Sequence, residues 1–407
     1  MPEIISTPSK GVVEGEDREH HFAYFETQNK RSTQEDALAW HTLGEKQLRS
    51  LSPQKIGQRL WTTCKQLDER AKHFTVEAGT TACMTVFDGR DSVITASVGD
   101  SVAFLVAYGK KGEVISATRL NSTLHHPMVL SEKERILKAG GSIDASNRIN
   151  GILSVSRAIG DYDTLDTQGN KLAISDAAVE IASISQLLEE EEEPVSKIQL
   201  ISTCDGFTDG AEDSRIESQV MYLLTCLAHM DKPGFKTEAE IAAFLAACAI
   251  ESKSEDNISI AVQTLVYGMP IFLGLYDGHG GNRVAHDAAM SSGEIFLEQC
   301  ALSQQDYELQ SLSTVNNKKR FEKDNAKTND FIERKSPCFL EELAGTVNEA
   351  VLNEGIKTLS LKEEVVLKNE ASLPCQKSST LSPGFFSHNY QNKEGEKVVM
   401  NTSTFAS

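Results

Sequence analysis

The most informative stretch of the chain reads Ile271-Phe-Leu-Gly-Leu-Tyr-Asp-Gly-His-Gly-Gly281. Its first six residues form an apolar run with the length of a buried β-strand. Asp277 follows the run directly, and the glycine after it lets the backbone turn sharply, so that a main-chain carbonyl can also face a ligand. The stretch therefore predicts a strand that ends in an acidic, functional turn.

Other acidic residues also lie at the ends of apolar runs. Asp205 follows the run 198–203, Asp100 follows the run 92–98, Asp256 precedes the run 258–266, and Glu35 and Asp36 open a run at 37–40. Acidic groups at neighbouring strand ends can converge on one edge of a sheet sandwich, where they repel one another unless cations neutralise them. The pattern therefore predicts bound metal.

The candidate ligands are all oxygen donors, and no cluster of cysteines or histidines accompanies them in the sequence. Hard, octahedral cations prefer such ligands, so we expect Mg²⁺ or Mn²⁺ rather than structural zinc. His125 and His126 resemble a metal-binding pair. Adjacent side chains on an extended segment point in opposite directions, however, and we interpret both histidines as non-ligands.

The composition restricts the class of protein. The 40 basic and 59 acidic residues give a net charge of −19, which argues against nucleic acid or anionic lipid as the main partner. Hydrophobic residues make up 40% of the 407, enough for a sizeable core. The longest apolar stretch, residues 241–250, is far shorter than the roughly 18 residues that a membrane span requires.

The N-terminal residues and the cysteines bear on the compartment. The chain opens without a charged-then-apolar leader, and its eight cysteines are scattered, with no C-x-x-C pair. Both features favour a reducing compartment. We expect a cytoplasmic monomer, and delivery into another cell stays open.

Strand-like and helix-like segments alternate between residues 23 and 303. The runs 80–87, 92–98 and 101–108 are separated by short turns, which predicts consecutive antiparallel strands. A capping-box pattern at Ser131-Glu-Lys-Glu134 predicts the start of a helix. Hairpins mixed with amphipathic helices favour an α+β fold, in which two packed antiparallel β-sheets are flanked by helices as an αββα sandwich.

We predict three parts of the chain. Residues 1–22 are polar, without apolar periodicity, and are expected to form a flexible lead. Residues 23–303 form the folded domain. Residues 304–407 are a polar extension, in which 337–367 has the periodicity of a helix that Pro337 could begin.

Seven short motifs, spread over residues 23–303, together resemble the metal-dependent serine/threonine protein phosphatases of the type 2C (PPM) family. Each motif is weak alone, because Asp-Gly is usually just a turn, but together in these strand contexts they are specific. The motifs are Arg31-Ser-Thr-Gln-Glu-Asp-Ala37, Asp277-Gly-His-Gly-Gly281, Gly79-Thr-Thr-Ala82, Gly99-Asp-Ser101, Asn150-Gly-Ile-Leu-Ser-Val-Ser-Arg-Ala-Ile-Gly-Asp161, Asp205-Gly-Phe-Thr-Asp209 and Glu255-Asp-Asn257.

The resemblance implies hydrolysis of phosphoserine and phosphothreonine in proteins by a metal-activated water. It implies that Asp277 bridges two metals, with the carbonyl of Gly278 on one of them. Asp205 and Asp256 complete one shell, Glu35 and Asp36 hold the other ion, and Asp100 contributes with Asp205 to a weaker third position.

The same resemblance assigns two further roles. Arg31 binds the substrate phosphate, because a guanidinium fork matches two phosphate oxygens. His279 is the general acid that protonates the departing serine or threonine oxygen. No covalent enzyme intermediate is needed, so none of the cysteines has to be a nucleophile.

The chain departs from the family in the order of its motifs. In the family, the Asp-Gly-His-Gly-Gly segment precedes Gly-Thr-Thr-Ala, whereas here it follows Glu255-Asp-Asn257. A site depends on spatial position and not on chain order. The relocation is therefore tolerable if the run 271–276 still inserts into the same slot of the sheet.

Two alternatives stay open at this point. One is a catalytically weak pseudophosphatase that acts as a binding scaffold, which gains if Asp277, Asp205 and Asp256 do not share one pocket. Pseudo-enzymes usually lose ligands, whereas this chain keeps them. The other alternative is an enzyme that hydrolyses a small phosphorylated metabolite.

Overall fold

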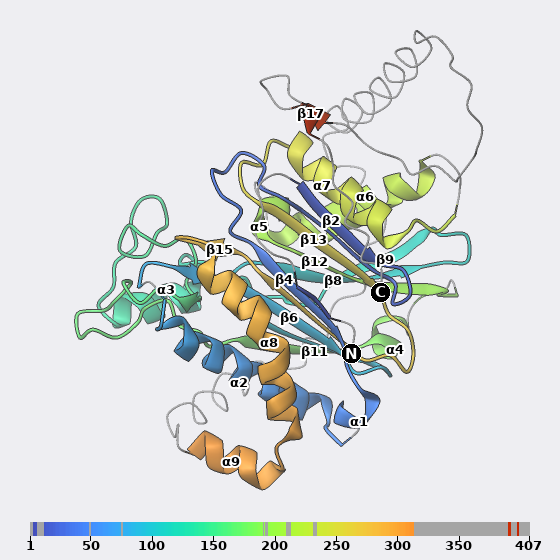
Figure 1. Cartoon of the computed structure of the whole chain (residues 1–407). Helices are drawn as coiled ribbons and strands as arrows, with labels where there is room; N and C mark the ends of the chain where they lie inside the picture. The colour runs from blue at the N-terminus through green and yellow to red at the C-terminus, as the bar shows by residue number, and fades with distance from the viewer. Residues whose placement is uncertain are drawn as a thin grey trace.

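Two antiparallel β-sheets pack face to face, with helices on both outer faces (Figure 1). The structure is a computed structural model. It describes residues 3–5, 12–48, 50–74, 76–189, 191, 194–208, 213–230, 234–312, 390–391 and 397–398. The predicted α+β sandwich is confirmed.

The first sheet has the strand order β1-β4-β14-β6-β7-β11. Strand β14 pairs antiparallel with β4 on one side and with β6 on the other, so a strand from late in the sequence fills a central position in the sheet. The bounds are β1 Glu3–Ile5, β4 Ala37–Thr42, β14 Ile271–Tyr276, β6 Ala82–Phe87, β7 Ser92–Val98 and β11 Ala178–Ser183.

The second sheet has the order β2-β3-β13-β12-β8-β9, and a small third sheet has the order β10-β5-β15. Two short strands, β16 Tyr390–Gln391 and β17 Lys397–Val398, pair with each other. The other bounds are β2 Val12–Asp17, β3 Phe22–Thr27, β13 Ile258–Thr264, β12 Lys197–Thr203, β8 Val102–Tyr108, β9 Val114–Arg119, β10 Ile159–Gly160, β5 Gly79–Thr80 and β15 Gly278–His279.

Helices α2 (Pro53–Ala71) and α8 (Arg283–Ala301) cover the first sheet, and α6 (Ile216–His229) and α7 (Glu238–Glu251) cover the second (Figure 1). None of the helices in the described ranges is long and apolar enough to span a membrane. The shorter helices are α1 Glu45–Leu48, α3 Leu130–Lys138, α4 Ile184–Leu187, α5 Asp205–Thr208, the 3₁₀ turn η1 Asp213–Arg215 and α9 Gln304–Leu312.

The apolar run of β14 is buried on both faces because it lies between two packed layers. Leu273 packs into the core between the two sheets, whereas Phe272 and Tyr276 pack under the helices that cover the first sheet. Successive strand residues point to opposite faces, so a strand covered on both faces has an unbroken apolar sequence. This burial fixes the position of Asp277, the next residue.

The predicted consecutive strands are only partly confirmed. Strands β6 and β7 form an antiparallel pair, but β7 belongs to the first sheet and β8 to the second, so no hairpin joins them. The turn between them contains Gly99, whose φ of +100° suits glycine. The chain crosses between the layers there, which places Asp100 at the end of both sheets.

The predicted boundaries of the domain were wrong at both ends. Strands β1 and β2 lie within residues 1–22, where we expected a flexible lead, and each pairs with its neighbour in a sheet. Helix α9 extends the domain beyond residue 303, because the Tyr307 hydroxyl lies 2.7 Å from Thr62 Oγ1 and 3.0 Å from the Gln58 carbonyl oxygen of α2. The predicted helix at 337–367 lies outside the described residues.

The predicted capping box at Ser131 was also wrong. Helix α3 begins at Leu130, and its N-cap residue Val129 makes no side-chain capping bond. A reciprocal capping box instead begins α7, where Thr237 and Glu240 each bond the backbone of the other.

Replacing Leu273 with alanine should lower the free energy of unfolding by about 2–5 kcal/mol, because the change leaves a cavity between the sheets. Leu309, which is 58% exposed, provides the control: Leu309→Ala should change stability by less than about 0.5 kcal/mol. Urea unfolding followed by circular dichroism measures both. Equal, small effects would show that β14 is not a core strand.

Candidate active site

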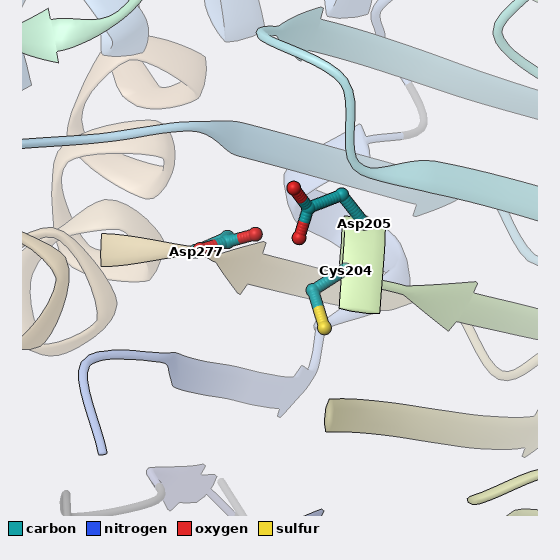
Figure 2. Close-up of side chains that lie close together, drawn as sticks. All are labelled: Cys204, Asp205 and Asp277. Atoms are coloured by element: carbon teal, nitrogen blue, oxygen red, sulfur yellow. The ribbon is translucent and has the colours of Figure 1, made fainter. Parts of the chain in front are cut away.

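Acidic residues from the ends of both sheets meet at one edge of the sandwich. Asp277 follows β14 of the first sheet, and Asp205 begins α5 after β12 of the second. Figure 2 shows the carboxylates of Asp277 and Asp205 facing each other, with the side chain of Cys204 beside them. One potential ligand atom from each lies within 4.8 Å of the other two. The edge where the two sheets end is therefore the candidate site.

Asp36, directly before β4, is fully enclosed. One of its carboxylate oxygens accepts a hydrogen bond of 2.6 Å from the Ser259 hydroxyl, and the other, Oδ1, has no hydrogen-bond partner among the residues that the structure describes. Burial, opposed by the hydrogen bond from Ser259 and reinforced by the charge of Asp205, raises the pKa of Asp36 to about 7. A positive partner beside this carboxyl group would favour its ionised form at neutral pH.

Two other buried carboxyl groups show the same effect. Burial raises the pKa of Asp277 well above its usual range, and the charges of Asp205 and Asp36 raise it further. Burial also raises the pKa of Asp100 to about 6, and in the described part of the chain its Oδ1 atom has no hydrogen-bond partner. Unpartnered, buried carboxylate oxygens gathered in one place fit hard divalent cations, which bind oxygen and offset this repulsion.

Gly278 lets the turn after β14 lie against the start of β4. A Cβ atom at this position would lie 2.3 Å from the backbone oxygen of Glu35, so no larger residue fits without a shift. The carboxylate of Glu35 accepts a hydrogen bond of 2.9 Å from the Thr33 hydroxyl. The glycine therefore allows the Asp277 segment to approach the Glu35 and Asp36 pair closely.

Arg31 lies at the rim of the site and forms an ion pair with Asp256. The side chain of Arg31 is 54% exposed, so it is accessible from outside. Burial lowers the pKa of its guanidinium, but Asp256, Asp205 and Asp277 raise it above the usual value. The positively charged guanidinium of Arg31 is thus held by the same carboxylates that form the site.

The side chain of His279 is held by a buried carboxylate. Its Nε2 atom lies 2.8 Å from both carboxylate oxygens of Asp161. Burial lowers the pKa of His279, whereas Asp161, Asp100 and Glu35 raise it, and the net shift is upward. The imidazole therefore lies in a strongly negative environment.

The sequence offers no reason to assign Cys204 a place at the site, but its potential ligand atom lies close to those of Asp205 and Asp277. The Cys204 sulfur accepts a hydrogen bond of 3.1 Å from the Ser259 N–H, and its thiol donates to the Asn257 carbonyl at 3.4 Å. Burial, followed by the charges of Asp36 and Asp277, raises the pKa of the thiol well above its usual value. We therefore interpret Cys204 as a protonated, hydrogen-bonded thiol that packs beneath the carboxylates.

Asn257 was quoted as part of a motif, but its role was missed. Its side-chain oxygen accepts from the Glu35 N–H at 3.0 Å, and its Nδ2 donates to the carbonyl oxygens of Gln28 at 3.0 Å and Thr33 at 2.9 Å. One side chain thus fastens the loop that carries Arg31 to the start of β13. An asparagine beside an acidic residue gives no sequence signal for such a distant partner.

The two adjacent histidines lie in different environments. His125 is fully buried with Nδ1 3.1 Å from the Gly99 nitrogen, whereas His126 is half exposed with Nδ1 3.7 Å from a carboxylate oxygen of Asp100. His126 therefore lies at the rim of the site, beside an acidic residue.

The structure brings the predicted site residues into one region. Each charged residue of this set interacts electrostatically with at least one other member, and Gly278 touches Glu35. The set is Arg31, Glu35, Asp36, Asp100, Asp205, Asp256, Asp277, Gly278 and His279.

The fold and this acidic edge agree with a comparison against known families. Residues 8–258 match the Protein phosphatase 2C family. This match covers more than half of the chain, which therefore belongs to that family, whose members are metal-dependent. The matched range ends before β14, so the segment Asp277–Gly281 lies outside it.

Individual relatives match shorter stretches. "Protein phosphatase ppm-1.G" of Caenorhabditis elegans is 34% identical over 150 residues, which are 36% of this chain and 27% of that protein. "Probable protein phosphatase 2C 60" of Arabidopsis thaliana is 34% identical over 136 residues, which are 32% of this chain and 33% of that protein. The chain thus spans a third or less of the length of these relatives.

Among solved structures, the chain is similar to a phosphatase from a pathogenic strain of Toxoplasma gondii. The TM-score is 0.45 and the sequence identity 19%, over 67% of this chain and 99% of that chain.

The raised carboxyl pKa values predict how metal-free stability depends on pH. Because folding raises the pKa of Asp36 from the usual value near 4 to about 7, its contribution to stability is complete below pH 4 and is lost as pH rises through 7. Removing one repelling charge with Asp277→Asn should therefore stabilise the EDTA-treated protein at pH 8 by roughly 1–3 kcal/mol, and by less at pH 5.

Thermal unfolding with EDTA or with Mn²⁺ measures this effect. Mn²⁺ should stabilise the unsubstituted protein more at pH 8 than at pH 5, and should stabilise Asp277→Asn less at both. Glu308→Gln is the control, because Glu308 is an exposed residue of α9. It should behave as the unsubstituted protein does. Destabilisation by Asp277→Asn in EDTA at pH 8 would contradict the proposed repulsion.

Proposed function

We propose that this chain is a metal-dependent phosphatase that hydrolyses phosphoserine and phosphothreonine in proteins. The observation that carries the proposal is the gathering of buried carboxyl groups beside one accessible guanidinium and one anchored imidazole. Asp36, Asp277 and Asp100 are held where they cannot all ionise without cations. Membership of the protein phosphatase 2C family supports the same reaction.

The acidic residues divide into sets that would hold Mg²⁺ or Mn²⁺. Asp277, with the carbonyl of Gly278, would be shared between two ions; Asp205 and Asp256 would bind one of them, and Glu35 and Asp36 the other. Asp100 would contribute with Asp205 to a weaker third position. When bound, the two cations supply a water nucleophile of lowered pKa and offset the charge of the phosphate.

Arg31 is suited to bind the phosphate. Its guanidinium is half exposed and already lies beside the carboxylates. Two of its N–H groups can donate in parallel to two phosphate oxygens. A phosphate bound in this way takes the place of Asp256 as the partner of Arg31, and its orientation directs the phosphorus towards the acidic edge.

His279 is suited to protonate the leaving oxygen. Its side chain is 30% exposed, and its Nε2 atom contacts Asp161, which leaves Nδ1 to meet the leaving group. Donation of a proton to the departing serine or threonine oxygen avoids the release of an alkoxide, and such general acid catalysis contributes about 10²–10⁴-fold to rate.

A role as a binding scaffold without turnover is less well supported than a role as an active phosphatase. Asp277 and Asp205 approach each other closely, and Asp256 is joined to the same region through Arg31. This grouping of the residues proposed to carry turnover supports an active enzyme. The choice between a phosphoprotein and a small phosphorylated metabolite depends on substrate comparison.

A phosphothreonine peptide should release phosphate in the presence of Mn²⁺ and not in EDTA. Asp277→Asn should lower the turnover number by at least about 100-fold, because a shared ligand is lost, whereas Glu308→Gln should leave it unchanged. Phosphate release is measured colorimetrically on protein that circular dichroism shows to be folded. Turnover that survives EDTA, or no turnover at all, would overturn the proposal.

Replacing Arg31 tests phosphate binding. Arg31→Ala should raise KM for the phosphopeptide by roughly 10–100-fold, because charged hydrogen bonds to phosphate are lost. Arg31→Lys should recover only part of this loss, since lysine cannot donate in a fork. The neighbouring Lys30→Ala, which removes an exposed ion pair with Glu255, is the matched control; an equal effect of the two alanine variants would argue for general surface charge.

A further inference from the structure

We infer that Asp161 is the positioning residue for His279: its carboxylate holds the hydrogen of the imidazole on Nε2, so that Nδ1 carries the proton given to the leaving group. This inference rests on the proposed function, in which His279 is the general acid.

The contact itself fixes the tautomer. Both oxygens of Asp161 lie 2.8 Å from Nε2 of His279. A carboxylate accepts hydrogen bonds and does not donate them, so Nε2 must be the donor. In the neutral imidazole the other nitrogen, Nδ1, is then free of hydrogen, and in the protonated imidazole it carries the second proton.

This arrangement determines the path of the proton. As the oxygen of the attacking water bonds to phosphorus and the P–O ester bond breaks, the electron pair of that bond stays on the serine or threonine oxygen, which takes the proton from Nδ1. The imidazole is left neutral with its hydrogen on Nε2, still bonded to Asp161. A proton from water then restores the acid.

Asp161 is held rigidly and is only 2% exposed. Its φ of +55° lies in the left-handed region, which aspartate tolerates better than most residues. Its own N–H donates to the Ala78 carbonyl at 3.0 Å, and the preceding Gly160 N–H donates to Asp68 of α2 at 2.9 Å. The backbone is therefore fastened on both sides.

The small third sheet brings Asp161 and His279 together. Its central strand β5 pairs with β10, which ends just before Asp161, and with β15, which ends at His279. A Cβ atom on Gly79 of β5 would lie 2.2 Å from a carboxylate oxygen of Asp161. The glycine thus leaves the space that the carboxylate occupies.

The contact does not have the character of a surface ion pair. Within the described residues, His279 is the hydrogen-bond partner of the Asp161 carboxylate, which lies almost wholly out of solvent. The exposed part of the pair is the imidazole. The buried group therefore orients the group that faces substrate.

Two substrates separate a role in protonation from general support of the fold. Asp161→Asn should lower kcat for a phosphothreonine peptide by roughly 10–100-fold with KM unchanged, because asparagine also permits the other tautomer. The change should be less than about threefold for p-nitrophenyl phosphate, whose phenolate leaves without protonation. Retained turnover of the second substrate also shows that the variant has folded.

A double variant tests whether the two residues act as one unit. His279→Ala should show the same substrate pattern, and Asp161→Asn combined with His279→Ala should be no slower than His279→Ala alone. Gly79→Ala, which displaces the carboxylate, should reproduce the pattern, and Asp163→Asn is the neighbouring control. Equal losses on both substrates, or additive losses, would overturn the inference.

A spectroscopic measurement separates this inference from the proposed function. Nitrogen NMR of histidine-labelled, Mg²⁺-bound protein should show His279 with hydrogen on Nε2, and a shift towards the Nδ1–H form in Asp161→Asn. A predominant Nδ1–H form in the unsubstituted protein would overturn the inference even if phosphatase activity is present. Absence of activity together with the Nε2–H form would overturn only the proposed function.

Discussion

Mutual repulsion among buried carboxyl groups is the constraint on which this site depends. Asp36, Asp277 and Asp205 come from segments far apart in the sequence, and the fold holds them close in a place that water does not reach freely. Apolar strands on both sides supply the energy that keeps them there, since each strand is anchored by its own buried side chains. Because bound cations relieve this repulsion, a fold that holds the carboxylates together binds cations more tightly.

Close backbone contacts determine the geometry around these charges. Gly278 lets the turn after β14 approach Glu35, and Gly79 leaves room for the Asp161 carboxylate. Asn257 ties the loop that carries Arg31 to the first residues of β13. The charged residues of the site thus depend on neighbours that carry no charge, and these neighbours set the distances.

The sequence predicted the sandwich and the acidic edge because both leave local signals. The apolar run before Asp277 and the alternation of strands and helices depend on neighbours in the chain, and the family resemblance supplied the individual roles. Contacts between distant segments left no such signal. The partner of His279, the bonds of Asn257 and the position of Cys204 depend on pairing in space, as does the crossing of the chain at Gly99 between the two sheets. The N-terminal strands were missed because edge strands need little apolar sequence.

The central position of β14 has a consequence for biosynthesis. Strands β4 and β6 leave the ribosome long before β14 does, yet each needs β14 as a partner. Until about residue 276 has emerged, the first sheet has a gap at its middle, and two hydrogen-bonding edges stay open to wrong partners. A nascent chain that stops short of this strand lacks both a complete sheet and Asp277, so truncated products carry neither a finished core nor the chemistry of the whole domain.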